Sequence, residues 1–399
     1  MIRFYTIEFA RRGGGACGTN GSGDLEVSQR RFWEGFLPIF GLGRLVIVGV
    51  TPLTPPEKPE VLEKFSICLF DGVLDGGFSL LWNSSPLSSQ AKNEEHSCDC
   101  DHRRQFMKLL NFFADDGSVH LGVVQDASVG DLTEMFPEDS SFRSLTRWLR
   151  APERVRNSTL ESLQGIRSSS MAQRTLEHLK LAPLIDTDCR IFCVGLNYAD
   201  HAAENNLAPP ESPVFFAKLT STVTQHGESI PLPSASSQVD YEAEMAFVVG
   251  RRAYRLSEEN ARSSIAGYTI LNDVTARDLQ IRDGQWFRGK NCDGFAPLGP
   301  WLSTSDEVTN PDALEITLRL NGEVRQHSNT SKLFFKPLQL LSALSQTLTL
   351  EPGDVISTGT PAGVGYHRKP KLFLKPGDVV EIEIDGIGTL RNFVAAGVR

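Results

Sequence analysis

The sequence predicts a mainly β protein with a few helices, arranged as a mostly antiparallel sandwich or roll. From Arg190 onward, short apolar runs bounded by turn residues dominate the chain, and such runs are typical of strands. The dipeptide Asn321-Gly322 joins two of these runs, and it is the strongest local signal of a β-hairpin. Helical patterns are scattered among the strands instead of alternating with them, which argues against a parallel α/β fold.

The chain is longer than one compact core usually requires, and its character changes along its length, so we expect three regions. Residues 1–106 contain Gly-rich and Pro-rich stretches without sustained periodicity, which predicts a poorly ordered extension. Residues 107–185 predict a small N-terminal α+β domain. Residues 186–399, with most of the strand signals, predict the main domain.

Each region has its own expected elements. In residues 107–185 we expect a hairpin around Asp115–Ser118, a second turn near Gly130-Asp131, and one or two short helices between Asn157 and Lys180. The strands expected in the main domain are Ile191–Gly195, Pro213–Lys218, Val239–Gly250, Ile265–Leu271, the hairpin Leu314–Gln326, Gly353–Ser357 and Gly377–Ile384. The helices expected there are Glu258–Ala266 and Pro337–Gln346.

Composition excludes several classes of protein. The 399 residues carry a formal net charge of −9 without a basic stripe, which argues against a nucleic-acid surface and favours a small substrate. The apolar runs are too short to span a bilayer, so we expect no membrane contact. Seven irregularly spaced cysteines indicate a reducing, intracellular compartment. Residues 1–31 mix five arginines with acidic side chains, so a mitochondrial and a cytoplasmic location both stay open.

Two carboxylates stand two residues apart in the apolar stretch Val239–Gly250, namely Glu242 and Glu244. Alternate side chains of a strand point the same way, so their heads can meet, with Cα atoms roughly 7 Å apart. Asp273 follows the apolar run Ile265–Leu271, where a second strand would end. Three such carboxylates suit a hard ion, Mg²⁺, Mn²⁺ or Ca²⁺, better than zinc. The alternative is that Glu242 and Glu244 form the solvated face of an edge strand.

A second group of polar residues follows Asn197. If this stretch forms one or two helical turns, His201 and Glu204 are neighbours. A histidine held by a carboxylate can take a proton from water near neutral pH, as a general base does. An ordinary surface His–Glu pair is the alternative. Lys290, which follows Gly289 and an aromatic pair, is placed to meet an anion.

The Gly-rich turn Ser357–Gly365 lacks the Gly-Lys-Ser/Thr of a nucleotide-binding loop, but its amides and hydroxyls can bind a carboxylate. With it, five motifs stand in order: G-x-N-Y-x-D-H-x-x-E, E-x-E, N-D-V-T-A-R-D, G-K and T-G-T-P-x-G-V-G. This series resembles the fumarylacetoacetate hydrolase (FAH) family, and most closely its FAH-domain-containing protein 2 branch. The match is strong from Asp186 to Val394 and loose from Met107 to Arg150.

The resemblance implies a mixed β-sandwich roll as the fold of the catalytic domain, which would be residues 186–399. It implies a homodimer as the assembly. It also implies that Glu242, Glu244 and Asp273 are ligands of a divalent ion, usually Mg²⁺ or Mn²⁺ in the family.

The resemblance further implies roles for five other side chains. His201 and Glu204 would form a catalytic dyad on a short lid helix. Lys290 and Gln280 would face the reacting oxygens, and Thr360 would hold a substrate carboxylate.

Substrates of the family are 2-oxo and 1,3-dioxo acids, whose enolates a divalent ion and a lysine can stabilise. The resemblance favours oxaloacetate keto–enol tautomerisation, with acylpyruvate hydrolysis and oxaloacetate decarboxylation as alternatives, because all three share one enolate. A hypothesis of another class is a non-catalytic metal-binding module on the same fold. His201 and Glu204 argue against this module, since a binding protein needs no general base.

Deletion of residues 1–106 tests the predicted boundary at Met107. We expect thermal stability and turnover to stay close to those of the full chain, because a segment without periodic apolar positions has little surface to pack against the body. The measurement compares the melting temperature and kcat of the full and the shortened protein. A large loss of stability would reveal an apolar interface and contradict the prediction.

Overall fold

The computed structural model describes residues 2–7, 45–50, 107–157, 173–204 and 207–397. The chain divides into two compact units, Met1–His96 and Ser97–Arg399. In the first unit, β1 (Ile2–Ile7) and β2 (Leu45–Val50) pair antiparallel. Most of residues 1–106 lie outside the described residues, so the expected extension there stays a prediction, as do the boundaries after residues 106 and 185.

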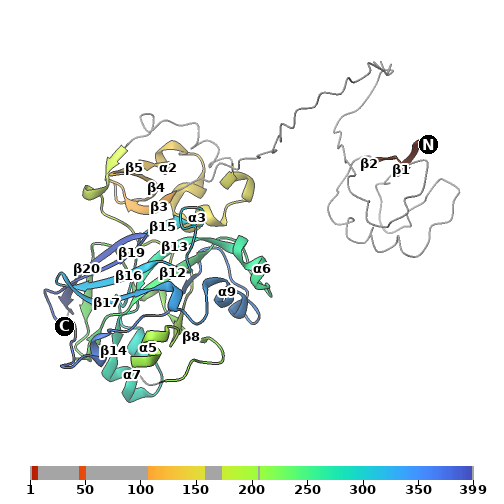
Figure 1. Ribbon diagram of the computed structural model, residues 1–399. Coiled ribbons are helices and arrows are strands. Elements are labelled where there is room, and N and C mark those ends of the chain that lie inside the picture. The colour runs from red at the N-terminus through yellow and green to blue at the C-terminus, as the bar shows by residue number, and fades with distance from the viewer. Residues whose placement is uncertain (1, 8–44, 51–106, 158–172, 205–206, 398–399) are drawn as a thin grey trace, which may run out of the picture. The chain divides into compact units, whose positions relative to one another are not determined.

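The second unit is built on a large mixed sheet (Figure 1). In spatial order its strands are β6 (Gln173–Thr175), β5 (Ser128–Asp131), β4 (Val119–Gln125), β3 (Lys108–Phe113), β15 (Ala296–Thr304), β13 (Ile265–Asn272), β12 (Ala243–Val249), β18 (Val355–Ser357), β7 (Ile191–Gly195) and β8 (Val214–Lys218), and β9 (Val223–Gln225) pairs with β15. Among these described strands the pairs β18–β7 and β15–β9 are parallel and the other pairs are antiparallel. The predicted, mostly antiparallel fold class is confirmed.

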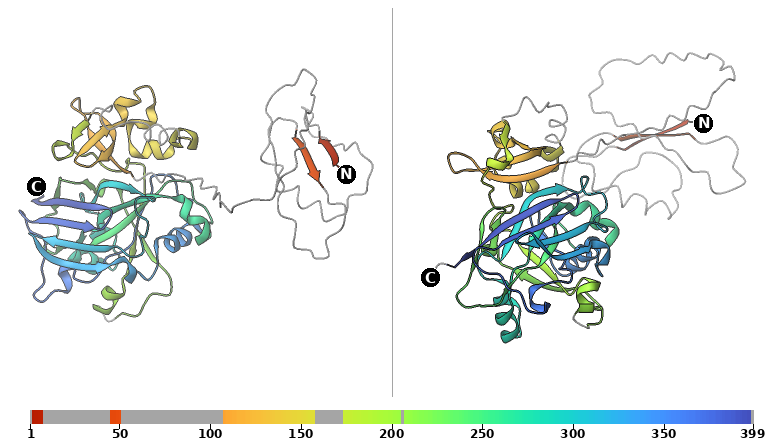
Figure 2. Two further views of the ribbon diagram at one scale, coloured as in Figure 1. Left: turned by 45° about the horizontal axis from the view of Figure 1, so that its top comes forward. Right: turned by 60° about the vertical axis from the view of Figure 1, so that its left-hand side comes forward.

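A second sheet covers one face of the first. Its strands are β10 (Ser229–Leu232), β20 (Gly388–Ala396), β19 (Val379–Ile384), β16 (Glu315–Leu320) and β17 (Glu323–Asn329). Figure 2 shows the blue strands of this sheet beside the green and teal strands of the main sheet. Phe247 and Ile270 of the main sheet share a core with apolar side chains of β16 and β19, namely Ile316, Leu318, Ile382 and Ile384. The two sheets therefore pack face to face as a sandwich.

Strand β12 is buried on both of its faces, and all seven of its residues are buried. Met245 and Phe247 point into the core shared with the second sheet. Ala246 and Val248 point to the opposite face, where they pack in a core with Trp148 from the N-terminal part of this unit. A strand covered on both faces has no solvated side, so the alternative of a solvated edge strand for Glu242 and Glu244 is wrong.

The helices of the described residues are short. They include α2 (Leu132–Met135), α3 (Leu145–Arg150), α5 (Ala199–Glu204), α6 (Glu258–Ala261), α7 (Arg277–Asp283), α8 (Phe287–Lys290) and α9 (Pro337–Ser345), and residues 153–157 are helical as well. Turns of 3-10 helix are η1 (Ser140–Arg143), η3 (Leu176–His178), η4 (Thr220–Thr222), η5 (Arg262–Ser264), η6 (Thr330–Lys332) and η7 (Gly365–His367). None of the helices in the described part of the chain is long and apolar enough to cross a membrane.

Several expected elements are confirmed. The strand Ile191–Gly195 has the predicted bounds, and the predicted hairpins form between β3 and β4 and between β16 and β17. Asn321 and Gly322 both adopt positive φ angles, 56° and 80°, as a two-residue hairpin turn requires. The expected helix Pro337–Gln346 corresponds to α9, which starts with proline at its first turn.

Other expectations need correction. The turn after β4 lies at Asp126, whose φ is 54°, and Gly130-Asp131 instead ends strand β5. Residues 173–175 form a strand where a helix was predicted, and residues 158–172 lie outside the described residues. The helix predicted to reach Ala266 ends earlier, because Ile265 begins β13. Helices α7 and α8 were not predicted, although Gly284 after α7, with φ 65°, is a typical end signal.

Substitution of Gly267 by alanine tests the packing of β13 against β15. A Cβ atom at this position would lie 2.2 Å from the carbonyl oxygen of Ser303, so the strands would have to separate. We expect the free energy of unfolding to fall by about 3 kcal/mol, measured by chemical denaturation. Gly322→Ala is the control, since its Cβ meets no atom within 4 Å and only the positive φ costs about 1 kcal/mol. Equal losses would contradict the proposed close approach.

Candidate active site

Three carboxylates meet where β12 and β13 lie side by side. Glu242 directly precedes β12, Glu244 is its second residue, and Asp273 directly follows β13. The backbone N–H of Asp273 donates to the carbonyl of Glu242 at 3.0 Å, which fixes the two strand ends together. Carboxylate oxygens of all three residues lie within 4.8 Å of one another, and all three are buried. The structure therefore brings together the three predicted ligands.

Three cationic side chains neutralise two of these carboxylates. The Lys290 ammonium lies 2.8 Å from Glu242 Oε2 and 2.7 Å from Asp273 Oδ2. Lys218 donates to Asp273 Oδ1 at 2.6 Å, and Arg277 donates to Glu242 Oε1 at 2.6 Å. Every oxygen of Glu242 and Asp273 therefore has a cationic nitrogen beside it.

Glu244 has a different environment. Its Oε2 accepts hydrogen bonds from Ser357 Oγ and from the backbone N–H of Gly359, and it has no cationic partner within the described residues. Burial, together with the negative charges of Asp273 and Glu242, raises the pKa of Glu244 well above its usual value. Burial also opposes the charge of Glu242, but Lys290 and Arg277 outweigh it and lower the pKa of Glu242 to about 2. Glu244 is thus the carboxyl of the three whose negative charge, when ionised, has no cationic partner in the described part of the site.

Asp240 ends the short strand β11 (Val239–Asp240), which pairs with β14 (Thr275–Ala276), and it completes this set. It is fully buried and accepts from Arg277 Nε at 2.9 Å. The seven buried side chains are called the charged cluster below: Asp240, Glu242, Glu244, Asp273, Lys218, Arg277 and Lys290. Within it, four carboxylates face three cations.

The charged cluster fits a divalent ion. Its donors are carboxylate oxygens, which Mg²⁺, Mn²⁺ and Ca²⁺ prefer. Buried carboxylates at this spacing repel one another, and a cation beside Glu244 would compensate the one charge that no side chain of the described site neutralises. If all three carboxylates held an ion, the carboxylate oxygens of Glu242 and Asp273 would contact both that ion and the lysine side chains, Lys290 and Lys218.

Gln280 and Thr360 lie near the charged cluster, but the Gln280 side-chain oxygen and the Thr360 hydroxyl already have protein partners. Gln280 Oε1 accepts from Arg277 Nη1 at 3.2 Å. Thr360 Oγ1 donates to the carbonyl of Ala243 at 3.0 Å and accepts from Gln326 Nε2 at 2.9 Å. Their predicted contacts with reacting oxygens and with a substrate carboxylate stay predictions.

The predicted dyad lies on α5. His201 Nδ1 lies 3.4 Å from Glu204 Oε2, and His201 is only 9% exposed, so it does not belong to an ordinary surface pair. The same Glu204 oxygen accepts from the backbone N–H of Gly363 at 3.3 Å. Burial would raise the pKa of Glu204, but these contacts lower it below its usual value. His201 also helps to lower the pKa of Glu242, which places the dyad beside the charged cluster.

Polar anchors fix the start and middle of α5. Asn197 donates to the carbonyls of Phe335 and Thr358 at 2.9 and 2.8 Å. Asp200 accepts from Lys332 at 3.2 Å and from the backbone N–H of Ala362 at 3.3 Å. These contacts hold the helix that carries His201 against the Gly-rich turn.

Sequence reasoning missed three members of the charged cluster, Asp240, Lys218 and Arg277. Signals for them exist in the sequence. Lys218 ends an otherwise apolar strand, and a buried lysine at such a place requires a carboxylate partner. Arg277 lies in the motif that follows Asp273, and Asp240 lies two residues before Glu242.

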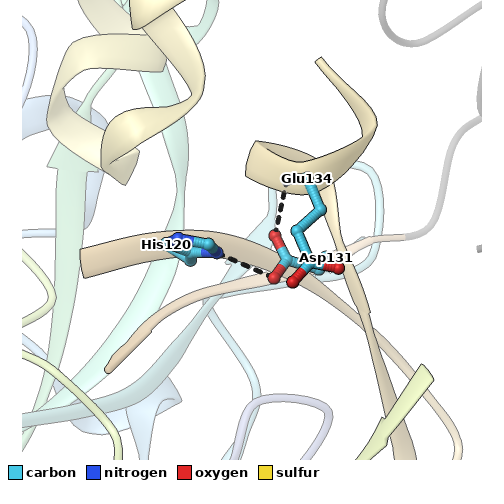
Figure 3. A group of neighbouring side chains, drawn as sticks. All are labelled: His120, Asp131 and Glu134. Carbon is cyan, nitrogen blue, oxygen red and sulfur yellow. Dashed lines mark hydrogen bonds and ion pairs between the residues drawn. The ribbon is translucent and has the colours of Figure 1, made fainter. Parts of the chain in front are cut away.

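A second group of possible ligands lies in the N-terminal part of the second unit. Figure 3 shows His120 pointing to Asp131, whose Oδ2 lies 2.8 Å from His120 Nδ1. The other oxygen of Asp131 accepts from the backbone N–H of Glu134 and caps α2. Arg174 Nη2 lies 3.1 Å from Glu134 Oε1 and its Nε lies 3.9 Å from Asp131. Capping and ion pairing explain this group without an ion.

Comparisons with known proteins agree with this geometry. The family model described as "Fumarylacetoacetate (FAA) hydrolase C-terminal" matches residues 190–395. The protein named oxaloacetate tautomerase fahd2, mitochondrial, from Xenopus laevis is 39% identical over 294 residues. The matched part covers 72% of this chain and 89% of that protein.

Solved structures show the same fold. A fumarylacetoacetate hydrolase from the psychrophilic Exiguobacterium antarcticum is 35% identical, with a TM-score of 0.63 over 73% of this chain and 99% of that chain. A maleylpyruvate hydrolase from Sphingobium sp. SYK-6, in complex with manganese(II) ion and pyruvate, is 28% identical, with a TM-score of 0.60 over 73% of this chain and 100% of that chain. The predicted type of fold is confirmed.

Glutamine substitutions at two of the carboxylates should have opposite effects on the metal-free protein. Glu244→Gln removes a buried charge without a cationic partner, so we expect stability to rise by on the order of 1 kcal/mol. Glu242→Gln leaves Arg277 and Lys290 without a full partner, so we expect a loss of about 3 kcal/mol. Thermal unfolding in a chelator measures both.

The same variants test the ion. Added Mg²⁺ should raise the melting temperature of the unmodified protein, since a ligand that binds only the folded state stabilises it. Neither variant should show this rise. Loss of stability in Glu244→Gln equal to that in Glu242→Gln would show that the charge distribution in the charged cluster is misassigned.

Proposed function

The chain belongs to the fumarylacetoacetate hydrolase family, and we propose that it interconverts the keto and enol forms of oxaloacetate with a divalent ion. The observation that carries the proposal is the convergence of Glu242, Glu244 and Asp273 beside Lys290 and the His201 dyad. The name of the Xenopus laevis relative, an oxaloacetate tautomerase, supports the choice of reaction. A divalent ion bound beside Lys290 would also suit an anionic substrate.

Glu242, Glu244 and Asp273 would hold the ion, with Mg²⁺ or Mn²⁺ as the best candidates. When bound, the ion supplies a Lewis acid to the oxygens of a 2-oxo acid. Manganese in the Sphingobium hydrolase supports an ion of this kind.

The chain's own residues supply the proton chemistry. In the keto form the C3–H bond of oxaloacetate breaks, and a ring nitrogen of His201 takes that proton. Glu204 orients the ring. The Lys290 ammonium places positive charge where the C2 oxygen becomes negative. A proton returns to that oxygen to give the enol, so the conversion consumes no proton overall.

Hydrolysis of an acylpyruvate is the second candidate reaction. The specific observation in its favour is the pairing of the buried His201 with Glu204, which can equally activate a water molecule. The Sphingobium relative, by its name, hydrolyses maleylpyruvate. Oxaloacetate decarboxylation would use the ion and Lys290 and would need the dyad less. A binding module without catalysis would need no dyad at all.

The proposal also covers the cellular location of the protein, its oligomeric state and its type of ligand. The name of the Xenopus laevis relative supports a mitochondrial location. The family resemblance supports a homodimer. The net charge of −9 supports a small substrate rather than nucleic acid as the partner, and the family resemblance supports an acid.

Substitution of His201 by alanine separates the candidate reactions. We expect keto–enol exchange of oxaloacetate and acylpyruvate hydrolysis to fall by on the order of a hundredfold, because both require a base. Decarboxylation of oxaloacetate should fall less. The three rates are measured with and without Mg²⁺ on the same preparation.

His178→Ala is the control, since His178 is an exposed histidine on η3. It should leave every rate close to that of the unmodified protein. If His201→Ala retained all three activities while the protein still bound Mg²⁺, the role given to the dyad would be wrong.

A further inference from the structure

A second histidine lies beside the dyad. His367 is the last residue of η7, which follows the Gly-rich turn. Its ring meets the ring of His201 edge to face, with centroids 5.9 Å apart and an interplanar angle of 68°. His367 is half-buried, so part of its side chain stays accessible beside the dyad.

The backbone around His367 is fixed to the rest of the site. Asp240 accepts from the backbone N–H groups of Gly365 at 2.7 Å and Tyr366 at 3.0 Å, and it also binds Arg277. The His367 ring also packs against the ring of Tyr366, with centroids 5.1 Å apart. The position of His367 is therefore set by the same carboxylate that positions Arg277.

The polar atoms of His367 are available for a ligand. Within the described residues, no side chain or backbone group forms a hydrogen bond with its ring nitrogens. The neighbouring guanidinium groups are occupied: Arg277 binds Asp240 and Glu242, and Arg368 donates to two backbone carbonyls. Burial lowers the pKa of His367, and Glu204 offsets this effect only in part. A neutral imidazole carries one N–H donor, and a carboxylate oxygen can only accept.

The role proposed for His201 determines which group of the substrate lies next to this histidine. In the proposed function His201 takes a proton from C3 of a four-carbon 2-oxo acid, whose C1 and C2 oxygens lie at the charged cluster. The C4 carboxylate is bonded to C3, so it must lie beside His201. His367 is the neighbouring ring with an unused N–H group there.

We propose that His367 donates a hydrogen bond to the substrate carboxylate remote from the charged cluster, and that this contact makes the site select dicarboxylic 2-oxo acids. The proposal rests on the proposed function, which sets the direction of the substrate. His367 is then a substrate-binding residue and takes no part in proton transfer.

The experiment compares two inert acids that differ only in the remote carboxylate, malate and lactate. Binding of each to the full chain is measured by calorimetry in saturating Mg²⁺. The unmodified protein should bind malate roughly tenfold more tightly than lactate, as expected for a hydrogen bond to a charged group. In His367→Phe, which keeps an aromatic ring against His201, the affinity for malate should fall to near that for lactate. The affinity for lactate should stay unchanged.

Two further variants sharpen the result. His367→Gln keeps an N–H donor and should retain part of the preference for malate. His178→Phe makes the same change of residue type at an exposed histidine and should retain all of it. Equal binding of the two acids by the unmodified protein, or an unchanged preference in His367→Phe, would overturn the proposal.

The binding experiment on His367 and the test of the proposed tautomerase activity can fail independently of each other. A protein that prefers malate through His367 but does not exchange the keto and enol forms of oxaloacetate would retain this binding contact and lose the tautomerase assignment. A protein that catalyses the exchange but shows no preference for malate would lose the contact alone.

Discussion

The burial of four carboxylates against three cations is the constraint on which the rest of this site depends. Charges in a protein interior are costly unless each has a partner in good geometry. The two ion-pair partners of Asp273, Lys218 and Lys290, come from a strand and a helix, so the charged cluster forms only when β8, β13 and α8 are all in place. Apolar cores on both sides of β12 exclude water from it.

The sequence predicted those parts of the site that depend on local patterns. The spacing of Glu242 and Glu244, and the position of Asp273 after an apolar run, follow from strand periodicity. The hairpin at Asn321-Gly322 follows from the backbone angles that those residues favour. Which strands pair could not be derived this way. The register that sets Ala243 opposite Asn272, and so brings Asp273 to Glu242, is a long-range property.

The cations were harder to predict because their partners are distant in sequence. Lys218 is 55 residues from Asp273, and Arg277 is 35 residues from Glu242. A lysine at the end of an apolar strand indicates that a carboxylate partner is needed, but it does not show which carboxylate that is. The resemblance to the family supplied Gln280 and Thr360 as candidates, but it could not show that the hydroxyl of Thr360 already donates to a backbone carbonyl.

The two ends of the site differ in charge, and this difference orients a substrate. At the charged cluster, cations and a bound ion would hold the oxygens of a 2-oxo acid. At the dyad, the ring of His367 lies beside the ring of His201, whose Nδ1 lies 3.4 Å from the carboxylate of Glu204. A second carboxylate is tolerated near Glu204 only where a donor compensates the repulsion between the two negative charges. The ring of His367 supplies that donor. The 2-oxo acid end of the substrate would therefore lie at the charged cluster, and its remote carboxylate would lie at His367.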